Sequence, residues 1–518
     1  MEFSHPYSRY GLALVMLENE VDNPENVTNV QIRESLIWGL NHFRMKPSGF
    51  YEGANSVKFD YMPYEYIMNN KEFQSKGKTD EGIFLSPNII TSDKGAGQTW
   101  NAVNSLVEKL DSEKSGGTES LTMSLFAASA KFNNGKKSQS TPKASMLEVA
   151  CAAITNITQD KPCLAYNVHR KGRVNTAIIP DLKLSEMMKF IVFFRKMLYH
   201  ETNKNLFTGK VSFTVLGKGI SATAQYKPQR PNIYNGNFPN SPKSSAMGSI
   251  ALLAAIGEWA KRSGNYAEGS AVLDSLVNTP IYMISYGNAK SFTFNHYVIE
   301  LAKNAQLNTI VDSIYYSKVF NTKWRSFAES DVQAYQKFDL FASRFLQLFN
   351  RPALKDFLAS RAEYPYQLDI LFTTYFTKME KINEDIVKSA KELGRWLNYV
   401  AYLAAKGENS NTRSEDFMKA KAKVLVEIES SAFSAKSGHA LIAQVVTRAG
   451  RLSQMDAPPD ATLFMEKTCS GELPIDHAKN LLMAFSRLRN KYEKPATEDV
   501  AEEVESDGSD ETKEYAES

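Results

Sequence analysis

The sequence predicts an α+β protein: a mixed α/β N-terminal part with β-hairpins, then an all-α C-terminal four-helix bundle and a disordered acidic tail. Two observations lead to this prediction. Apolar and polar residues alternate around glycine turns in the first part, and apolar residues recur every three or four positions in the second. With 518 residues, the chain has room for about three domain-sized units. We expect a mixed domain at 1–330, a helical connector at 331–378, the bundle at 379–495 and the tail at 496–518.

The N-terminal part contains strands joined by short turns as well as amphipathic helices. Glycines at Gly217 and Gly219 allow the positive φ that a tight hairpin turn requires, with Lys218 outward at its tip. Helices are predicted at Arg33–Phe43, after a capping Ser185, and at Ala246–Arg262. The predicted strand pairs are Cys163–Val168 with Arg173–Ile179, Val211–Val215 with Ile220–Tyr226, and Ile281–Tyr286 with Lys290–Asn295.

The C-terminal part contains only helical patterns. The longest apolar stripe starts at Met379 and is ended by Gly407. Three further stripes begin at Phe417, Leu441 and Asp476, and each is too narrow to be buried alone, which favours a bundle. The outer faces are predicted to carry basic side chains, which fit either a solvated surface or a track for a phosphate backbone. These residues are Lys388, Lys391, Arg395, Lys419, Lys421, Lys423, Arg448, Arg451, Arg487, Arg489 and Lys491.

Catalytic and metal-binding motifs are missing from the sequence. There is no phosphate-binding P-loop pattern, no HExxH and no GxSxG. The three cysteines, Cys151, Cys163 and Cys469, form no CxxC pair, so neither a zinc site nor a disulfide framework is expected. We therefore expect a binding protein rather than an enzyme, with no metal and no cofactor. The sequence also predicts no signal peptide or membrane span, which favours a cytoplasmic location.

The formal net charge of +3 conceals a strong asymmetry along the chain. Residues 498–518 contain ten acidic residues and one lysine, so this segment carries −9 and residues 1–497 carry +12. Such a segment has almost nothing to bury and is predicted to be disordered. It fits either a solvating tail or a mimic of nucleic-acid charge that covers a basic surface.

Positive charge gathers in three blocks of the N-terminal part. No acidic residue lies between Glu201 and Glu258, or between Glu119 and Glu148, and His169–Arg173 forms a third basic block. Blocks of one sign in loops and hairpins are typical of surfaces that face a polyanion, although ordinary solvated lysine loops remain the alternative. The lysines and arginines concerned are Lys131, Lys136, Lys137, Lys143, Arg170, Lys171, Arg173, Lys204, Lys210, Lys218, Lys227, Arg230 and Lys243.

The loop at 227–243 combines these cations with aromatic and asparagine side chains. Tyr226, Tyr234 and Phe238 alternate with basic residues, and aromatic rings can stack on bases. Asparagines can read base edges in a groove. The alternative is a packed surface loop whose aromatic rings are turned into the core.

This layout resembles the large subunit of a type I CRISPR surveillance complex (Cascade). The segment KSAKELGRWLNYVAYLAAKG, residues 388–407, is similar to the first bundle helix of that family, with its Leu-Gly-Arg step. The segment GKGISATAQYKPQRPNIYNGN, residues 217–237, is similar to the basic loop that the family uses near target DNA. Some members carry a CxxC zinc pair that this chain lacks, so the subtype stays open.

The resemblance implies a role in antiviral defence. Such a subunit binds the 5′ handle of the crRNA, recognises the protospacer-adjacent motif (PAM) of target double-stranded DNA, helps to open the duplex and recruits a helicase-nuclease effector. Its other partners are the backbone, 5′-handle and small subunits, and a separate small subunit starting at Met379 is one possibility in this chain. A stand-alone protein that coats single-stranded nucleic acid, as a nucleocapsid does, is the alternative.

The candidate nucleic-acid-binding residues follow from this local charge and loop character. Lys218, Asn232, Asn235 and Asn237 are the candidates for reading the motif. The candidates for phosphate contact are Arg170, Lys171, Arg173, Lys210, Lys227 and Arg230.

Overall fold

The computed structural model of the chain divides into two compact units, Met1–Ala342 and Ser343–Ser518. The residues described are 3–53, 56–63, 84–85, 93–111, 117–127, 142–168, 172–221, 223–229, 231–238, 245–285, 288–315, 344, 347–348, 354–358, 363–364, 366–408, 411–412 and 415–489.

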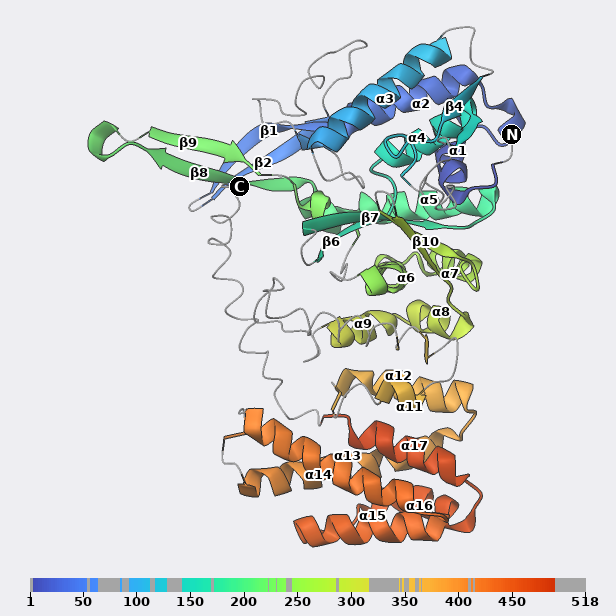
Figure 1. The fold of residues 1–518 in the computed structure, drawn as a ribbon, viewed down its shortest axis with the longest axis vertical. Helices are drawn as coiled ribbons and strands as arrows, with labels where there is room; N and C mark the ends of the chain where they lie inside the picture. The colour runs from blue at the N-terminus through green and yellow to red at the C-terminus, as the bar shows by residue number, and fades with distance from the viewer. Residues whose placement is uncertain are drawn as a thin grey trace. The chain divides into compact units, whose positions relative to one another are not determined.

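The first unit mixes helices with small antiparallel sheets, as the sequence predicts (Figure 1). Its helices are α1 (Pro6–Glu18), α2 (Asn29–Phe43), α3 (Asp93–Asp111), α4 (Met146–Ile157), α5 (Leu184–Leu198), α6 (Ser245–Ser263), α7 (Tyr266–Ser275), α8 (His296–Lys303) and α9 (Leu307–Tyr315). Its strands are β1 (Arg44–Gly53), β2 (Ser56–Pro63), β3 (Phe84–Leu85), β4 (Thr118–Ser120), β5 (Lys143–Ser145), β6 (Cys163–Val168), β7 (Gly172–Pro180), β8 (Thr208–Leu216), β9 (Thr223–Pro228), β10 (Ile281–Ser285) and β11 (Asn288–Phe292).

Two sheets organise this unit. One has the order β3-β1-β2-β8-β9 and the other the order β11-β10-β7-β6, while β4 and β5 form a separate pair. All three predicted strand pairs are present: β6 with β7, β8 with β9, and β10 with β11. The prediction that Ser185 caps α5 is wrong, because the helix begins at Leu184 and Lys183 occupies the cap position without a side-chain hydrogen bond.

Helix α1 is the buried centre of the first unit, and the sequence pattern did not reveal it. Nearly every position from Pro6 to Met16 is buried, so the helix lacks the polar face that produces a periodic signal. It lies directly against α4, where a Cβ added to Gly11 would be 1.8 Å from the carbonyl oxygen of Cys151. The Tyr7 hydroxyl also donates to Asn156 Oδ1 at 2.9 Å.

The second unit is helical in the part that the structure describes. Its elements are α11 (Leu354–Leu358), α12 (Asp369–Thr374), a π-helical turn (Tyr375–Met379), α13 (Glu384–Glu408), α14 (Glu415–Ser434), α15 (Gly438–Ser453), α16 (Thr462–Ser470) and α17 (Ile475–Ser486). The four expected helices correspond to α13, α14, α15 and α17, and α13 packs against the other three and against α16. The short helix α16 was not predicted.

The start of α13 differs from the prediction. Met379 ends the preceding π-helical turn, and Lys381 has a φ of 55°, which breaks the helical path before Glu384. Asn383 then accepts a hydrogen bond from the backbone of Asp385 at 2.8 Å. The whole acidic tail lies outside the described residues.

Several basic residues assigned to outer faces lie inside the second unit instead. Lys421 is 1% exposed and pairs with Glu363 at 2.9 Å. Arg487 holds Glu429 through two hydrogen bonds of 2.6 Å and 2.5 Å. Although burial alone raises the pKa of Glu363, Lys421 and Arg489 outweigh it and lower that pKa. These cations therefore connect helices and are unavailable to a phosphate backbone.

A glycine pair in α13 tests how closely this helix packs. A Cβ at Gly394 would lie 2.5 Å from Cβ and 2.7 Å from the backbone carbonyl carbon of Phe485, whereas Gly407 has open space around it. We expect Gly394→Ala to lower the free energy of unfolding by about 2 kcal/mol through overpacking. Gly407→Ala should raise it by up to about 1 kcal/mol through helix propensity. Chemical denaturation measures both changes, and equal effects would contradict the close approach of α13 and α17.

A second prediction compares two glutamates of α14. Glu429 is buried with Arg487, whereas Glu427 forms an exposed pair with Arg448 at 2.9 Å. Glu429→Gln leaves a buried guanidinium without its counter-charge, so we expect a loss of about 3 kcal/mol or more. Glu427→Gln should cost less than about 1 kcal/mol. A comparable loss in both variants, measured by denaturant unfolding, would argue against a buried ionic connection.

Candidate nucleic-acid interface

A projecting β-hairpin is the most distinctive surface feature of the first unit. Strand β8 pairs with β2 only at its first residues, where Thr208 lies opposite Asp60 and Lys210 opposite Lys58. Beyond this point β8 pairs with β9 alone, from Val211 opposite Pro228 to Leu216 opposite Thr223. The result is a two-stranded ribbon that extends away from the rest of the unit (Figure 1).

The foot of the hairpin depends on a glycine. Gly209 lies under the ring of Tyr61, and a Cβ there would be 2.5 Å from the Tyr61 hydroxyl oxygen. The Tyr61 side chain is largely buried, and burial raises the pKa of its hydroxyl. A side chain at position 209 would displace this ring. Glycine at this position therefore lets Tyr61 pack over the foot of the hairpin, where β8 leaves the sheet edge.

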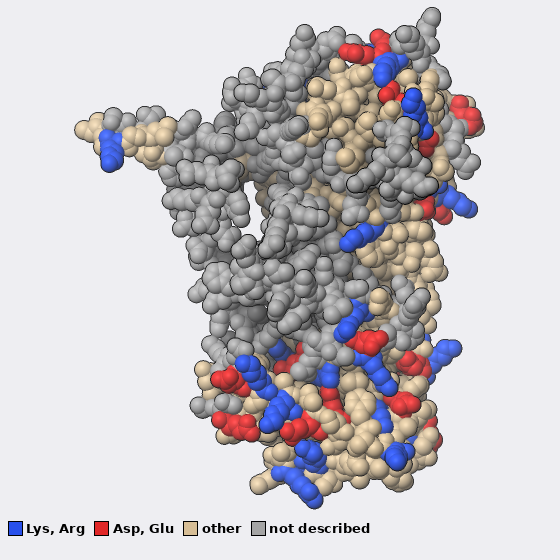
Figure 2. Space-filling view, viewed as in Figure 1, with Lys and Arg blue, Asp and Glu red and all other residues tan. Residues whose placement is uncertain are grey.

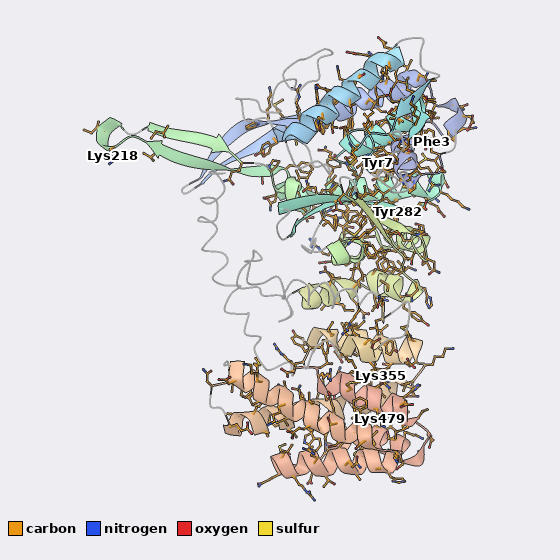
Figure 3. The ribbon with its side chains drawn as sticks, viewed as in Figure 1. Phe3, Tyr7, Lys218, Tyr282, Lys355 and Lys479 are labelled. Carbon is orange, nitrogen blue, oxygen red and sulfur yellow. The ribbon has the colours of Figure 1, made fainter. Side chains whose placement is uncertain are left out.

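The tip of the hairpin combines a cation with exposed apolar side chains. Gly217 and Gly219 have φ values of 95° and 69°, and the turn continues into a short 3₁₀ segment at Gly219–Ser221. Lys218 is exposed at the tip, where Figure 3 labels it, and Figure 2 shows a basic side chain in blue at the end of the projecting ribbon. Val215 and Leu216 are about half exposed, and Ile220 is fully exposed. Ile220 was predicted to begin a strand, but the two positive-φ glycines widen the turn so that it lies in the tip.

The other basic candidates are only partly described. Lys210 and Lys227 lie in β8 and β9, where Lys227 is opposite Ser212, and Arg173 lies in β7 opposite Asn167. Arg170, Lys171 and Arg230 lie outside the described residues. The structure therefore brings Lys210, Lys218 and Lys227 onto one hairpin, whereas Arg173 belongs to the other sheet.

The segment after the hairpin is docked on β6. Gly236 forms a bridge with Leu164, and the backbone amide of Asn237 donates to the Cys163 carbonyl at 3.1 Å. Ile233 and Phe238 are buried, so for Phe238 the structure favours the alternative of a packed loop with its ring turned into the core. The short 3₁₀ segment Asn232–Asn235 contains two of the asparagine candidates. Of these, Asn232 is exposed and donates to the Asn205 carbonyl at 3.2 Å.

Asn237 is a structural residue, which corrects its assignment to motif reading. Its side chain is fully buried. Its Oδ1 accepts from the Cys163 amide at 2.7 Å, and its Nδ2 donates to the carbonyls of Gln159 and Lys161 at 3.0 Å and 2.7 Å. A buried amide whose donors and acceptor are engaged cannot reach a base edge.

Among the residues that the structure describes, no helix has both the length and the apolar character required to cross a membrane. Within the same part of the chain, His, Cys, Asp and Glu side chains form no group of three or more that could hold a metal ion.

Comparison with known proteins identifies one family. The model of the family described as CRISPR-associated protein Csp2 matches residues 5–489. No curated protein and no solved structure matches the chain.

The three buried hydrogen bonds of the Asn237 side chain should contribute to the stability of the protein. Asn237→Ala leaves a buried amide and two buried carbonyls without partners, so we expect it to lower the free energy of unfolding by about 2 kcal/mol. Asn232→Ala removes one exposed hydrogen bond and should change it by less than about 0.5 kcal/mol. Denaturant unfolding of both variants checks this, and a stable Asn237→Ala protein would contradict the structural role.

Proposed function

Because the chain belongs to the CRISPR-associated protein Csp2 family, we propose that it binds the crRNA 5′ handle and recognises the PAM of target double-stranded DNA. The family is one of type I (Cascade) large subunits, which makes the chain a Cascade subunit with crRNA and other Cascade subunits as partners. In the proposal it also helps to open the duplex and to recruit the helicase-nuclease effector. Sequence specificity then comes mainly from guide pairing, and the protein reads only the short motif and the backbone.

The projecting hairpin β8–β9 is the observation that carries this proposal. An isolated two-stranded ribbon is marginally stable in water, so its extension beyond the sheet edge favours a role in contacting a partner. The acid-free stretch at 202–257 includes the whole hairpin.

The apolar tip supports a part in duplex opening. Proteins that kink or unstack DNA frequently insert apolar side chains between base steps. Ile220 and Leu216 are exposed beside Lys218, so the tip offers both a wedge and a phosphate contact. In this proposal Lys210 and Lys227 bind phosphates along the ribbon. Asn232 and Asn235, which follow β9 at the foot of the ribbon, contact the motif.

The remaining basic block and the helical unit have supporting roles in the proposal. Arg170, Lys171, Arg173 and Arg230 contact the RNA or DNA backbone, within a nucleic-acid-contacting domain at 1–330. The connector at 331–378 and the bundle at 379–495 support the displaced strand and the effector. The proposal also includes a four-helix arrangement of the bundle and disorder of the acidic tail at 496–518.

The hairpin lysine provides a direct test in the assembled complex. We expect Lys218→Ala to weaken binding to every duplex alike, because at the exposed tip we assign Lys218 a phosphate contact in place of motif reading, and a phosphate contact carries no sequence information. The slope of log affinity against log salt should fall by about one. Fluorescence anisotropy with a labelled duplex measures both quantities.

Lys189, an exposed lysine of α5, provides the matched control. Lys189→Ala should leave the affinity and the salt slope unchanged. Identical slopes for wild type and Lys218→Ala would remove the tip from the interface. Tight coating of single strands by the isolated chain, with no dependence on crRNA or motif, would favour a nucleocapsid-like protein instead.

A further inference from the structure

The first unit contains a cavity of about 550 Å³ close to the foot of the hairpin. It is lined from α2 by Trp38 and His42, from β2 by Tyr61, and from the region of α5 by Tyr199. Phe207, the residue before β8, lines it as well. Phe207 thus connects the cavity to the proposed nucleic-acid surface, because it is next to the first residue of β8.

The walls of this cavity are aromatic. The rings of Trp38 and His42 lie 4.0 Å apart with an interplanar angle of 33°, and those of Tyr199 and Phe207 lie 5.7 Å apart at 11°. Aromatic walls stabilise a flat ring by stacking. This composition favours a planar occupant over an extended or aliphatic one.

The cavity also contains an acceptor that lacks a donor. Gln159 is 4% exposed and lines the cavity, and its Oε1 is buried without a hydrogen-bond partner. The orientation of this amide is fixed by its neighbours. The Tyr199 hydroxyl donates to Asp160 Oδ1 at 2.7 Å, so it must accept from Gln159 Nε2 at 2.9 Å. Gln159 Oε1 is therefore the acceptor beside the cavity that lacks a donor, although buried acceptors are nearly always satisfied. The atom has almost no accessible surface in this structure, so a ligand reaches it only when the neighbouring side chains move apart.

The charged groups of the cavity engage one another. Arg195 donates to Glu18 Oε1 at 2.9 Å and to Asp160 Oδ2 at 2.7 Å. Glu18 Oε2 accepts from the Ser35 hydroxyl at 3.1 Å. Two carboxylates against one guanidinium disfavour a phosphate, and their existing partners leave little attraction for a cation. A neutral group with an N–H donor fits the electrostatics best.

We propose that this cavity binds an unpaired nucleobase that presents an exocyclic amino group, as adenine, cytosine and guanine do. The base stacks on the aromatic walls and its amino group donates to Gln159 Oε1. The inference rests on the proposed function, because a nucleic acid that follows the hairpin passes Phe207 at its foot. The base comes either from the crRNA or from a DNA strand freed by duplex opening.

Ultraviolet cross-linking with mass spectrometry tests the site in the complex assembled with crRNA, before and after addition of the target duplex. We expect a base cross-linked to the peptide that contains Trp38 or to the one that contains Tyr199 and Phe207. A cross-link to RNA identifies the crRNA as the source, and one to DNA after target addition identifies a freed strand. Absence of both cross-links overturns the inference, as does a cross-link from the cavity only to a neighbouring protein subunit.

Two variants test the chemistry. Gln159→Leu removes the acceptor and Trp38→Ala removes a stacking wall, so each should lower the cross-link yield and weaken binding of the cross-linked strand about tenfold. Replacing the cross-linked base by uracil, which has no exocyclic amino group, should reproduce the Gln159→Leu loss. Gln444→Leu, in α15 of the helical unit, should change nothing.

The controls separate this inference from the proposed function. A folded Gln159→Leu protein with unchanged cross-linking and affinity overturns the base-binding site. If motif-dependent duplex binding and its dependence on Lys218 persist in that variant, the proposed function stands without the cavity. If the wild-type complex shows no guide-dependent binding of the duplex, both the base-binding site and the proposed function are contradicted.

Discussion

The short pairing of β2 with β8 is the constraint on which the proposed nucleic-acid surface depends. Three opposed positions, from Thr208 to Lys210, hold the foot of the hairpin, and everything beyond them pairs only within the ribbon. The bare backbone at Gly209 lets Tyr61 pack over that foot. The loop that follows returns to the second sheet through Asn237, so both ends of the ribbon are fixed while its tip stays exposed.

Much of the fold follows from sequence patterns because the patterns there are strong. Glycine turns between alternating residues predict the three strand pairs, and regularly spaced apolar stripes predict α13, α14, α15 and α17. The patterns miss α1 because a helix buried all round has no polar face. They also place Lys421 and Arg487 on the surface, since periodicity cannot show that Glu363 and Glu429 meet them inside.

The candidate binding residues were harder to predict, because a sequence shows which side chains are charged or polar but not which of them are exposed. Lys218 was predicted at a tip, which the structure confirms, since two glycines of positive φ fix that turn. Asn237 and Phe238 have the composition of a binding loop, yet both are buried, and Asn237 is bonded to the strand β6. Ile220, which lies in the exposed tip, was predicted to begin a strand. The cavity with Gln159 escaped prediction because its lining residues are spread along the chain from Glu18 to Phe207 and carry no motif.

The most direct measurement of the central claim is site-specific photo-cross-linking in the assembled complex with target DNA. A photoreactive amino acid replaces Lys218 at the hairpin tip or, as a control, Lys189 of α5. The account predicts that position 218 cross-links to the target duplex within a few base pairs of the PAM and that position 189 does not. Cross-links from position 218 only to protein subunits, or equal DNA cross-linking from both positions, would contradict it.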